Sequence, residues 1–114
     1  MMVRADIATG EAEAKMKYTR TDNGEETVLE IEGTLDAVTA PDLRGVVDQI
    51  VVEQRKSVAL DLSSLRLIDS SGVGLIVSLF KRIRQNGGQV RVLGLRDQPR
   101  AIFRLLRLDR VFPV

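Results

Sequence analysis

The sequence predicts an α/β fold (α+β in some classifications), with a mixed sheet of four to five strands and helices packed on it. Three observations predict it. Short strand-like runs are interleaved with longer runs in which apolar residues recur at helical spacing. An Asn-Gly pair near the start lies between two strand-like runs, which indicates an antiparallel hairpin. Each later strand is separated from the next by a helical run, as in sheets built with crossover connections.

Composition limits the classes of function. The chain has 114 residues, is 44% hydrophobic and has a net charge of +1, with no cysteine and no histidine. This is enough for a single hydrophobic core. It excludes disulfides, thiolate metal sites and any catalysis that depends on cysteine or histidine. No apolar run reaches the roughly 20 residues of a membrane span, so we expect a soluble, cytoplasmic protein.

An extension and a hairpin open the chain. Residues 1–14 show no sustained period, so we expect a flexible extension ahead of one domain over residues 15–114. Strands are expected at residues 16–20 and 27–31, on either side of the turn that contains Asn23-Gly24.

The next helix is predicted from about Pro41 to Glu53, because apolar residues recur there at helical spacing and proline favours the first turn. Thr39 is a candidate cap for it. Asp36, just before, is explained either as a turn residue or as part of a functional site.

The second half continues the alternation. Residues 57–62 are almost uniformly apolar and predict a central strand that is buried on both faces. A helix then follows from Asp69 to a stop at residues 86–88, and a fourth strand spans residues 89–93. Pro99 opens a last helix that ends near Leu106, and residues 111–114 form a short strand or tail.

A polar junction separates the central strand region from the helix after it. Asp69, Ser70 and Ser71 stand where the first N–H groups of a helix lack partners within the helix. Any of them is explained as an N-cap, which contributes about 1 kcal/mol. Gly72 and Gly74 each cost roughly 0.5–1 kcal/mol relative to alanine, but they leave a low surface that a second protein could approach. The junction is therefore either a helix cap or a contact site.

Four segments together resemble the STAS domains of bacterial anti-sigma factor antagonists. They are Asp69-Ser70-Ser71-Gly72-Val73-Gly74 with the strand before it, and residues 33–40, 87–92 and 108–112. The likeness covers roughly residues 15 to 114. It departs from the family at Arg107, where glycine is frequent, so the last helical turn could end differently.

The resemblance implies a STAS fold and a phosphorylation-controlled partner switch in transcription regulation, and not an enzyme. In the family, the unphosphorylated protein binds an anti-sigma factor that is also a serine kinase, and this frees the sigma factor. Ser70 corresponds to the serine whose phosphorylation abolishes binding, and a PP2C-type serine phosphatase resets the switch. The implied partner-binding positions are Asp36, Asp69, Ser71, Gly72 and Gly74, where Ser71 contributes to local geometry. No catalytic residue, cofactor or metal is implied, and we expect a monomer or weak dimer without direct nucleic-acid or membrane contact.

Two alternatives stay open. STAS domains also serve as scaffolds or regulatory subunits, in stressosomes and lipid-transport complexes, without a phosphorylated serine. Asp36 and Asp69 could instead form a receiver-like Mg²⁺ site with a phosphorylated aspartate. A receiver would have an acidic pair after its first strand and a lysine after a later one. Here the first strand ends in Arg20-Thr21, and no lysine follows Leu93.

The C-terminal third is basic, with nine Lys and Arg against Asp97 and Asp109 between residues 81 and 110. Arg100, Arg104 and Arg107 share one face of the last predicted helix. Nucleic-acid binding would favour aromatic residues among these bases, and the chain has few. A solvated polar face explains the charge best, and a docking patch for an acidic protein is the second interpretation.

Overall fold

A computed structural model describes residues 5–9 and 15–112 of the chain, and its sheet is organised around the predicted hairpin. β2 (Met16–Asn23) and β3 (Glu26–Leu35) pair antiparallel through all eight residues of β2. The turn between them begins at Gly24, whose φ of 63° suits glycine better than any other residue. The alternation in β3 buries Leu29 and Ile31 on one face, as the pattern predicts.

Parallel strands extend the sheet on the other side of β3. β4 (Ser57–Asp61) pairs with the first half of β3, and β5 (Leu65–Ile68) pairs with its last residues. β6 (Gln89–Leu93) lies beyond β4. Within the described residues the sheet has six strands, in the order β1-β2-β3-β4-β6 with β5 beside the end of β3. The predicted mixed sheet with packed helices is confirmed.

Residues 5–9 differ from the sequence expectation. β1 (Ala5–Thr9) pairs antiparallel with β2, from Ala5 opposite Thr21 to Thr9 opposite Lys17, and makes an edge strand where a flexible extension was expected. Backbone pairing at a sheet edge needs no particular side-chain pattern, which is why periodicity does not predict it. The rest of the expected extension lies outside the described residues.

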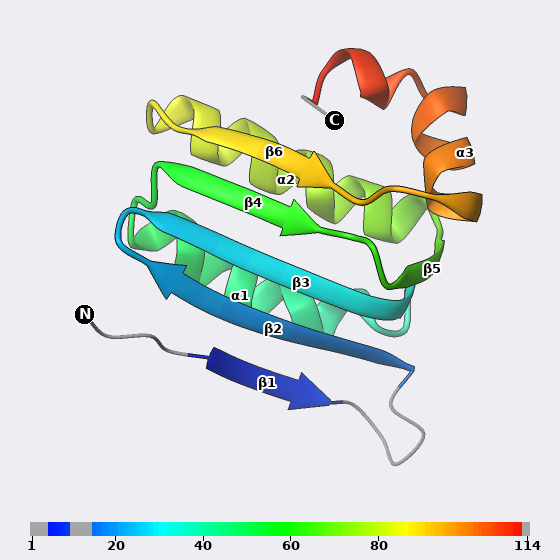
Figure 1. Ribbon diagram of the computed structural model, residues 1–114, viewed down its shortest axis with the longest axis horizontal. Coiled ribbons are helices and arrows are strands. Elements are labelled where there is room, and N and C mark those ends of the chain that lie inside the picture. Colours follow the sequence, from blue (N-terminus) through cyan, green and yellow to red (C-terminus); the bar gives the residue numbers. More distant parts are fainter. Residues whose placement is uncertain (1–4, 10–14, 113–114) are drawn as a thin grey trace.

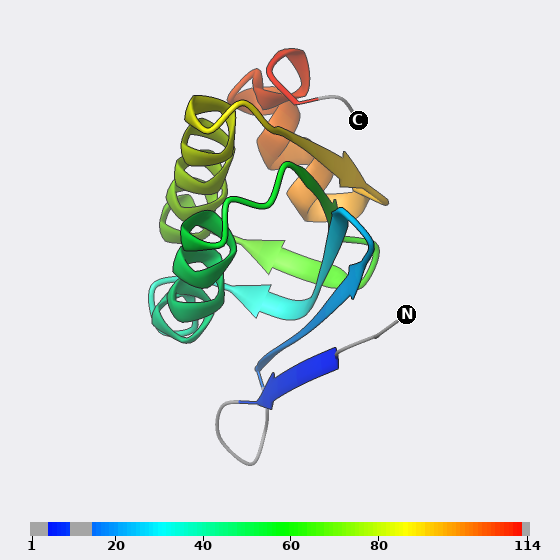
Figure 2. The same ribbon diagram turned by 90° about the vertical axis from the view of Figure 1, so that its left-hand side faces the viewer.

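Two long helices cover one face of the sheet. α1 (Ala40–Val52) connects β3 to β4, and α2 (Ser70–Gln85) connects β5 to β6. They lie side by side against the same face (Figures 1 and 2). Both match the predicted helices within a few residues. α3 (Asp97–Leu105) packs against β5, and a short 3-10 helix, η1 (Leu108–Arg110), follows it.

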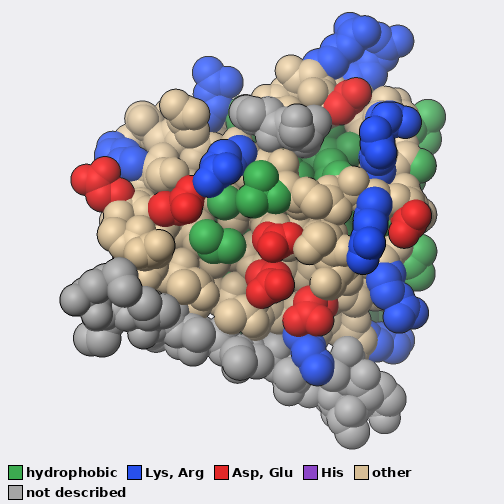
Figure 3. Space-filling view, viewed as in Figure 1, with side chains coloured by type: hydrophobic (Ala, Val, Ile, Leu, Met, Phe, Trp, Pro, Cys, Tyr) green, Lys and Arg blue, Asp and Glu red, His purple; other side chains and the backbone are tan. Residues whose placement is uncertain are grey.

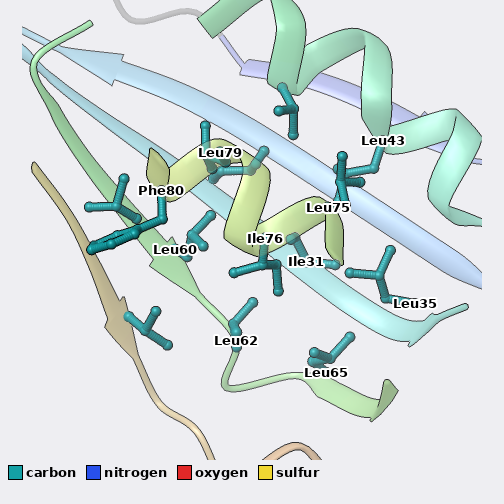
Figure 4. Packing of buried hydrophobic residues seen from close by; sticks show 14 of the residues in the cluster. Ile31, Leu35, Leu43, Leu60, Leu62, Leu65, Leu75, Ile76, Leu79 and Phe80 are labelled. Carbon is teal, nitrogen blue, oxygen red and sulfur yellow. The ribbon is translucent and has the colours of Figure 1, made fainter. Parts of the chain in front are cut away.

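The core fills the layer between the two helices and the sheet. Ile76 of α2 lies near Ile31 of β3 and Leu60 of β4, and Leu75 of α2 lies next to Leu43 of α1 (Figure 4). All five are at most 3% exposed. Burial of one such side chain stabilises the fold by about 1.5–3 kcal/mol, so this layer holds α2 and its N-terminus firmly in place.

In the described part of the chain, neither α1 nor α2 covers the opposite face of the sheet, where charged side chains lie around a small apolar patch (Figure 3). Acidic side chains gather near the centre of this face. Glu30 of β3 and Asp61 of β4 are partners in the parallel pairing of these strands. The prediction that the central strand is buried on both faces therefore holds only for its middle. Ala59 is fully buried, with its strand partners Val28 of β3 and Arg91 of β6 on either side. Asp61, at the end of the strand, is partly exposed.

The C-terminal segment is held by an aromatic cluster. Phe112 contacts Phe80 of α2 at 4.6 Å between ring centroids and Phe103 of α3 at 5.8 Å. Residues 111 and 112 form a turn and a bend, so the alternative of a short terminal strand is wrong for them, and residues 113–114 lie outside the described residues.

Candidate functional site

The junction, residues 69–74, lies at the end of β5 where the chain enters α2. Asp69 has extended backbone angles, φ −116° and ψ −172°, and it is the N-cap of the helix. Its carboxylate Oδ1 accepts hydrogen bonds from the N–H groups of Ser71 at 2.8 Å and Gly72 at 3.2 Å. The cap interpretation is therefore correct for Asp69, which satisfies two of the N–H groups left free at a helix start.

Asp69 also fastens the junction to the end of β3. Its backbone N–H donates to the carbonyl of Leu35 at 3.1 Å. Its second carboxylate oxygen accepts from the N–H of Ala37 at 3.3 Å. The loop that contains Asp36 and the start of α2 are thus joined by hydrogen bonds.

Asp36 organises the turn between β3 and α1. Its Oδ1 accepts from the N–H groups of Val38 and Thr39, both at 3.0 Å. The N–H of Thr39 is the main reason that the pKa of the Asp36 carboxyl lies below its usual value. Thr39 precedes α1 as predicted, but its hydroxyl donates to the carbonyl of Thr34 at 2.8 Å and does not cap the helix. The geometry accounts for Asp36 as a turn residue.

The two serines of the junction are both exposed. Ser70 and Ser71 occupy the first two positions of α2, and neither hydroxyl has a hydrogen-bond partner among the described residues. A hydroxyl in this position is open to solvent and to another protein. It is also at the positive end of a 16-residue helix, where negative charge is favoured.

The two glycines of the junction differ from each other. Gly74 is exposed, and a Cβ added there would meet no atom within 4 Å. Gly72 is buried, and a Cβ there would lie 2.7 Å from the carbonyl oxygen of Leu35 and 2.8 Å from the Ile68 side chain. Gly72 therefore lets α2 approach β3 and β5 closely, and it does not offer the open surface expected from the sequence. Only Gly74 provides that surface.

Two exposed apolar side chains that the sequence did not single out lie on segments joined to the junction. Val38, in the turn after β3, is 71% exposed, and Leu67 of β5 is 51% exposed. Neither follows a periodic pattern, because one lies in a turn and the other precedes the buried end of a four-residue strand. Val38 follows Ala37, whose N–H is bonded to Asp69, and Leu67 lies in the strand that leads into the junction.

The described residues contain no group of three or more His, Cys, Asp or Glu side chains that could hold a metal ion. Asp36 and Asp69 both bind backbone N–H groups through their carboxylates. A receiver-like Mg²⁺ site needs these oxygens for the metal, so the geometry favours the turn and cap roles for both residues.

No helix in the described part of the chain is long and apolar enough to cross a membrane. The basic C-terminal third is partly neutralised: Arg82 pairs with Asp48 at 2.8 Å and Arg91 with Glu26 at 2.6 Å. Arg100 and Arg104 are exposed on α3, which agrees with the interpretation of a solvated face.

Comparison with known proteins agrees with the fold. The family model for the STAS domain matches residues 15–114. An anti-sigma-B factor antagonist from Listeria monocytogenes is 27% identical over 84 residues, which cover 74% of each chain. The crystal structure of an anti-sigma factor antagonist from Mycobacterium paratuberculosis superposes with a TM-score of 0.76 at 23% identity, over 86% of this chain and 83% of that one. The Bacillus cell fate determinant SpoIIAA in its phosphorylated form superposes with a TM-score of 0.65 at 17% identity, over 96% of this chain and 86% of that one.

Proposed function

The chain belongs to the STAS domain family, and from this premise we propose that it is an anti-sigma factor antagonist whose binding is switched off by phosphorylation of Ser70. The observation that carries the proposal is the exposed hydroxyl of Ser70, next to the capping residue Asp69 at the start of α2. The relatives named as antagonists of anti-sigma-B factor support the partner class. The phosphorylated structure of SpoIIAA supports the type of switch.

The unphosphorylated protein would bind an anti-sigma factor through the surface around the junction. Gly74 keeps that surface low, while Val38 and Leu67 provide apolar area that a partner can cover. Small and apolar groups of this kind allow close packing, and close packing makes an interface sensitive to any group added at its centre. When this protein binds the anti-sigma factor, the sigma factor would be released.

Phosphorylation would transfer the γ-phosphoryl group of ATP to the Oγ of Ser70. The new O–P bond replaces the bond to ADP, which leaves, and the hydroxyl proton passes to a base of the kinase. The product carries about −1.5 to −2 charges at neutral pH. The serine kinase would be the anti-sigma factor itself, and a PP2C-type serine phosphatase would hydrolyse the phosphoserine and restore binding.

The cap explains why the added charge would act on the partner and not on the fold. The N–H groups of Ser71 and Gly72 are already bonded to Asp69, so they offer no ready cradle for the phosphoryl group. The dianion would project outward beside the Asp69 carboxylate, where the helix dipole still favours it by about 0.3–1 kcal/mol. We expect the domain to keep its shape while the contact surface changes its charge.

The experiment that tests the site is a phosphorylation assay with the anti-sigma factor kinases encoded in the same genome. Intact-mass spectrometry of the parent after incubation with ATP should show one added phosphoryl group. The Ser70→Ala variant should show none, whereas Ser71→Ala, its matched control on the next residue, should be modified like the parent. Undiminished incorporation into Ser70→Ala would assign the site elsewhere. An unmodified parent would favour the non-switching scaffold role instead.

A further inference from the structure

The outer edge of β5 is paired with a side chain. Within the described sheet β5 has only β3 as a strand neighbour. On its other side the N–H of Ile68 donates to Oε1 of Gln98 at 2.9 Å, and Nε2 of Gln98 donates to the carbonyl of Ile68 at 3.0 Å. The primary amide thus makes the donor and acceptor contacts that a neighbouring strand would make. Because Ile68 is only 3% exposed, water can hardly replace these bonds.

Ile68 connects this contact directly to the phosphorylation site. The next residue is Asp69, the N-cap of α2, and Ser70 follows it. The junction is therefore held from three directions: by Leu35 of β3, by Ala37 in the turn before α1, and by Gln98 of α3. The third attachment comes from an element that lies outside the sheet and the two covering helices.

α3 is able to hold the amide in place. Gln98 lies in its first turn and is partly buried. Further along the helix, Phe103 is fully buried and contacts Phe112. The backbone that carries Gln98 is therefore fixed, and only the side-chain rotamers have to be ordered for its two hydrogen bonds.

We propose that Gln98 is a positioning residue for Ser70: its amide holds the end of β5 so that the first turn of α2 keeps the geometry that the kinase and the anti-sigma factor bind. This rests on the proposed function. A preorganised site binds more tightly than one that must be ordered on contact. Loss of the Gln98–Ile68 pair should therefore weaken recognition of Ser70 without removing the hydroxyl or any surface residue around it.

Two substitutions at Gln98 separate the contributions of its amide. Gln98→Met has a similar length and removes both hydrogen bonds. Gln98→Glu keeps an acceptor for the N–H of Ile68 but, at neutral pH, has no proton to donate to the carbonyl. Gln89→Met is the matched control, since Gln89 is an exposed residue of β6 without a side-chain hydrogen bond among the described residues.

Amide hydrogen exchange measures the local effect without any partner. In Gln98→Met, the amides of residues 68–72 should exchange roughly tenfold faster or more, while amides in the middle of α1 and β4 stay close to the parent. Gln98→Glu should be intermediate and Gln89→Met unchanged. An unchanged rate at residues 68–72, or a rise spread evenly over the whole chain, would overturn the proposal.

Steady-state phosphorylation measures the functional effect. With Gln98→Met as the kinase substrate, KM should rise roughly three- to tenfold with little change in kcat. The substitution weakens binding of the substrate and of the transition state equally, and it leaves the Ser70 hydroxyl in place. A residue that only supports global stability would leave KM unchanged as long as the protein is folded. If the parent is phosphorylated at Ser70 and Gln98→Met has the same KM, the positioning role is refuted. If the parent is not phosphorylated while exchange at residues 68–72 still responds, the proposed function fails and the Gln98–Ile68 pair remains structural.

Discussion

At the scale of single residues, Asp69 determines how the candidate site is built. One carboxylate oxygen caps α2 and the other reaches the turn after β3. The residue next to it, Ser70, has its hydroxyl exposed and unused within the described structure. This division leaves the structural role to Asp69 and makes the Ser70 hydroxyl available for a reaction with another protein.

The two glycines of the junction give a test at this scale. Gly72→Ala should destabilise the protein by about 1–2 kcal/mol, because the new Cβ overpacks against Leu35 and Ile68, and this outweighs the better helix propensity of alanine. Gly74→Ala, the matched change two residues later, meets open space and should stabilise the protein by up to about 1 kcal/mol. Guanidinium unfolding of both variants measures this. Equal effects of the two changes would show that the packing of Gly72 is not as tight as described.

The sequence predicts the position of the site but not the roles of its residues. The Asp-Ser-Ser-Gly pattern identifies the strand-to-helix junction, because caps and turns have local signatures. It cannot distinguish Gly72 from Gly74, since the close approach of Gly72 to Leu35 depends on a strand that is distant in the sequence. The conformation of Arg107 is also not predicted from the sequence. Its φ is 60°, a value that glycine favours, and nothing in the structure explains an arginine there.

At the scale of elements, a charged network fastens the hairpin to the end of α1. The guanidinium of Arg20, 3% exposed, donates to Asp22 at 3.1 Å and to Glu53 at 2.5 Å. The hydrogen bond from Arg20 holds the pKa of the Glu53 carboxyl below its usual value. Burial raises the pKa of Asp22, but hydrogen bonds from Thr27 and Arg20 outweigh it and leave that pKa lowered as well.

This network predicts the pH dependence of stability. A carboxyl whose pKa is lowered by folding stabilises the protein above its unfolded pKa, about 4.3 for glutamate, and this contribution is lost as the pH falls through the folded pKa. Glu53→Gln should therefore be less stable than the parent at pH 7, by about 0.5–1 kcal/mol. Below about pH 3 the free energies of unfolding of the variant and the parent should converge.

The measurement is urea unfolding from pH 7 to pH 2.5. Glu25→Gln is the matched control, because Glu25 is an exposed turn residue whose side chain makes no hydrogen bond among the described residues. The free energy of unfolding of the control should fall with decreasing pH as steeply as that of the parent. If Glu53→Gln loses stability in parallel with the parent over the whole range, the network does not contribute as described.

Prediction of elements succeeds where they are long and periodic. α1 and α2 follow from apolar spacing alone, and the hairpin follows from its turn and alternation. The strands that the pattern does not define are the short edge strands β1 and β5. Each of these strands forms only because the backbone of another strand pairs with it. The local sequence pattern does not show which strand that is.

At the scale of the whole molecule, the arrangement keeps the proposed phosphorylation site, Ser70, separate from the core. α1 and α2 pack on one face of the sheet, while the start of α2 lies at the rim where β3 and β5 end (Figures 1 and 2). A charge added at Ser70 meets solvent or a partner and no buried side chain. We therefore expect a change in binding without a change in fold.

The most direct test of this account is the affinity of the two forms for the anti-sigma factor, measured by titration calorimetry after the parent has been fully phosphorylated at Ser70. The account predicts that the phosphorylated form binds roughly a hundredfold more weakly, equivalent to about 3 kcal/mol, while its circular dichroism and unfolding midpoint stay close to the parent. Ser70→Ala, treated with the kinase in the same way, should keep the affinity of the unphosphorylated parent. Equal affinity of the two parent forms, with complete phosphorylation verified by mass, would contradict the account.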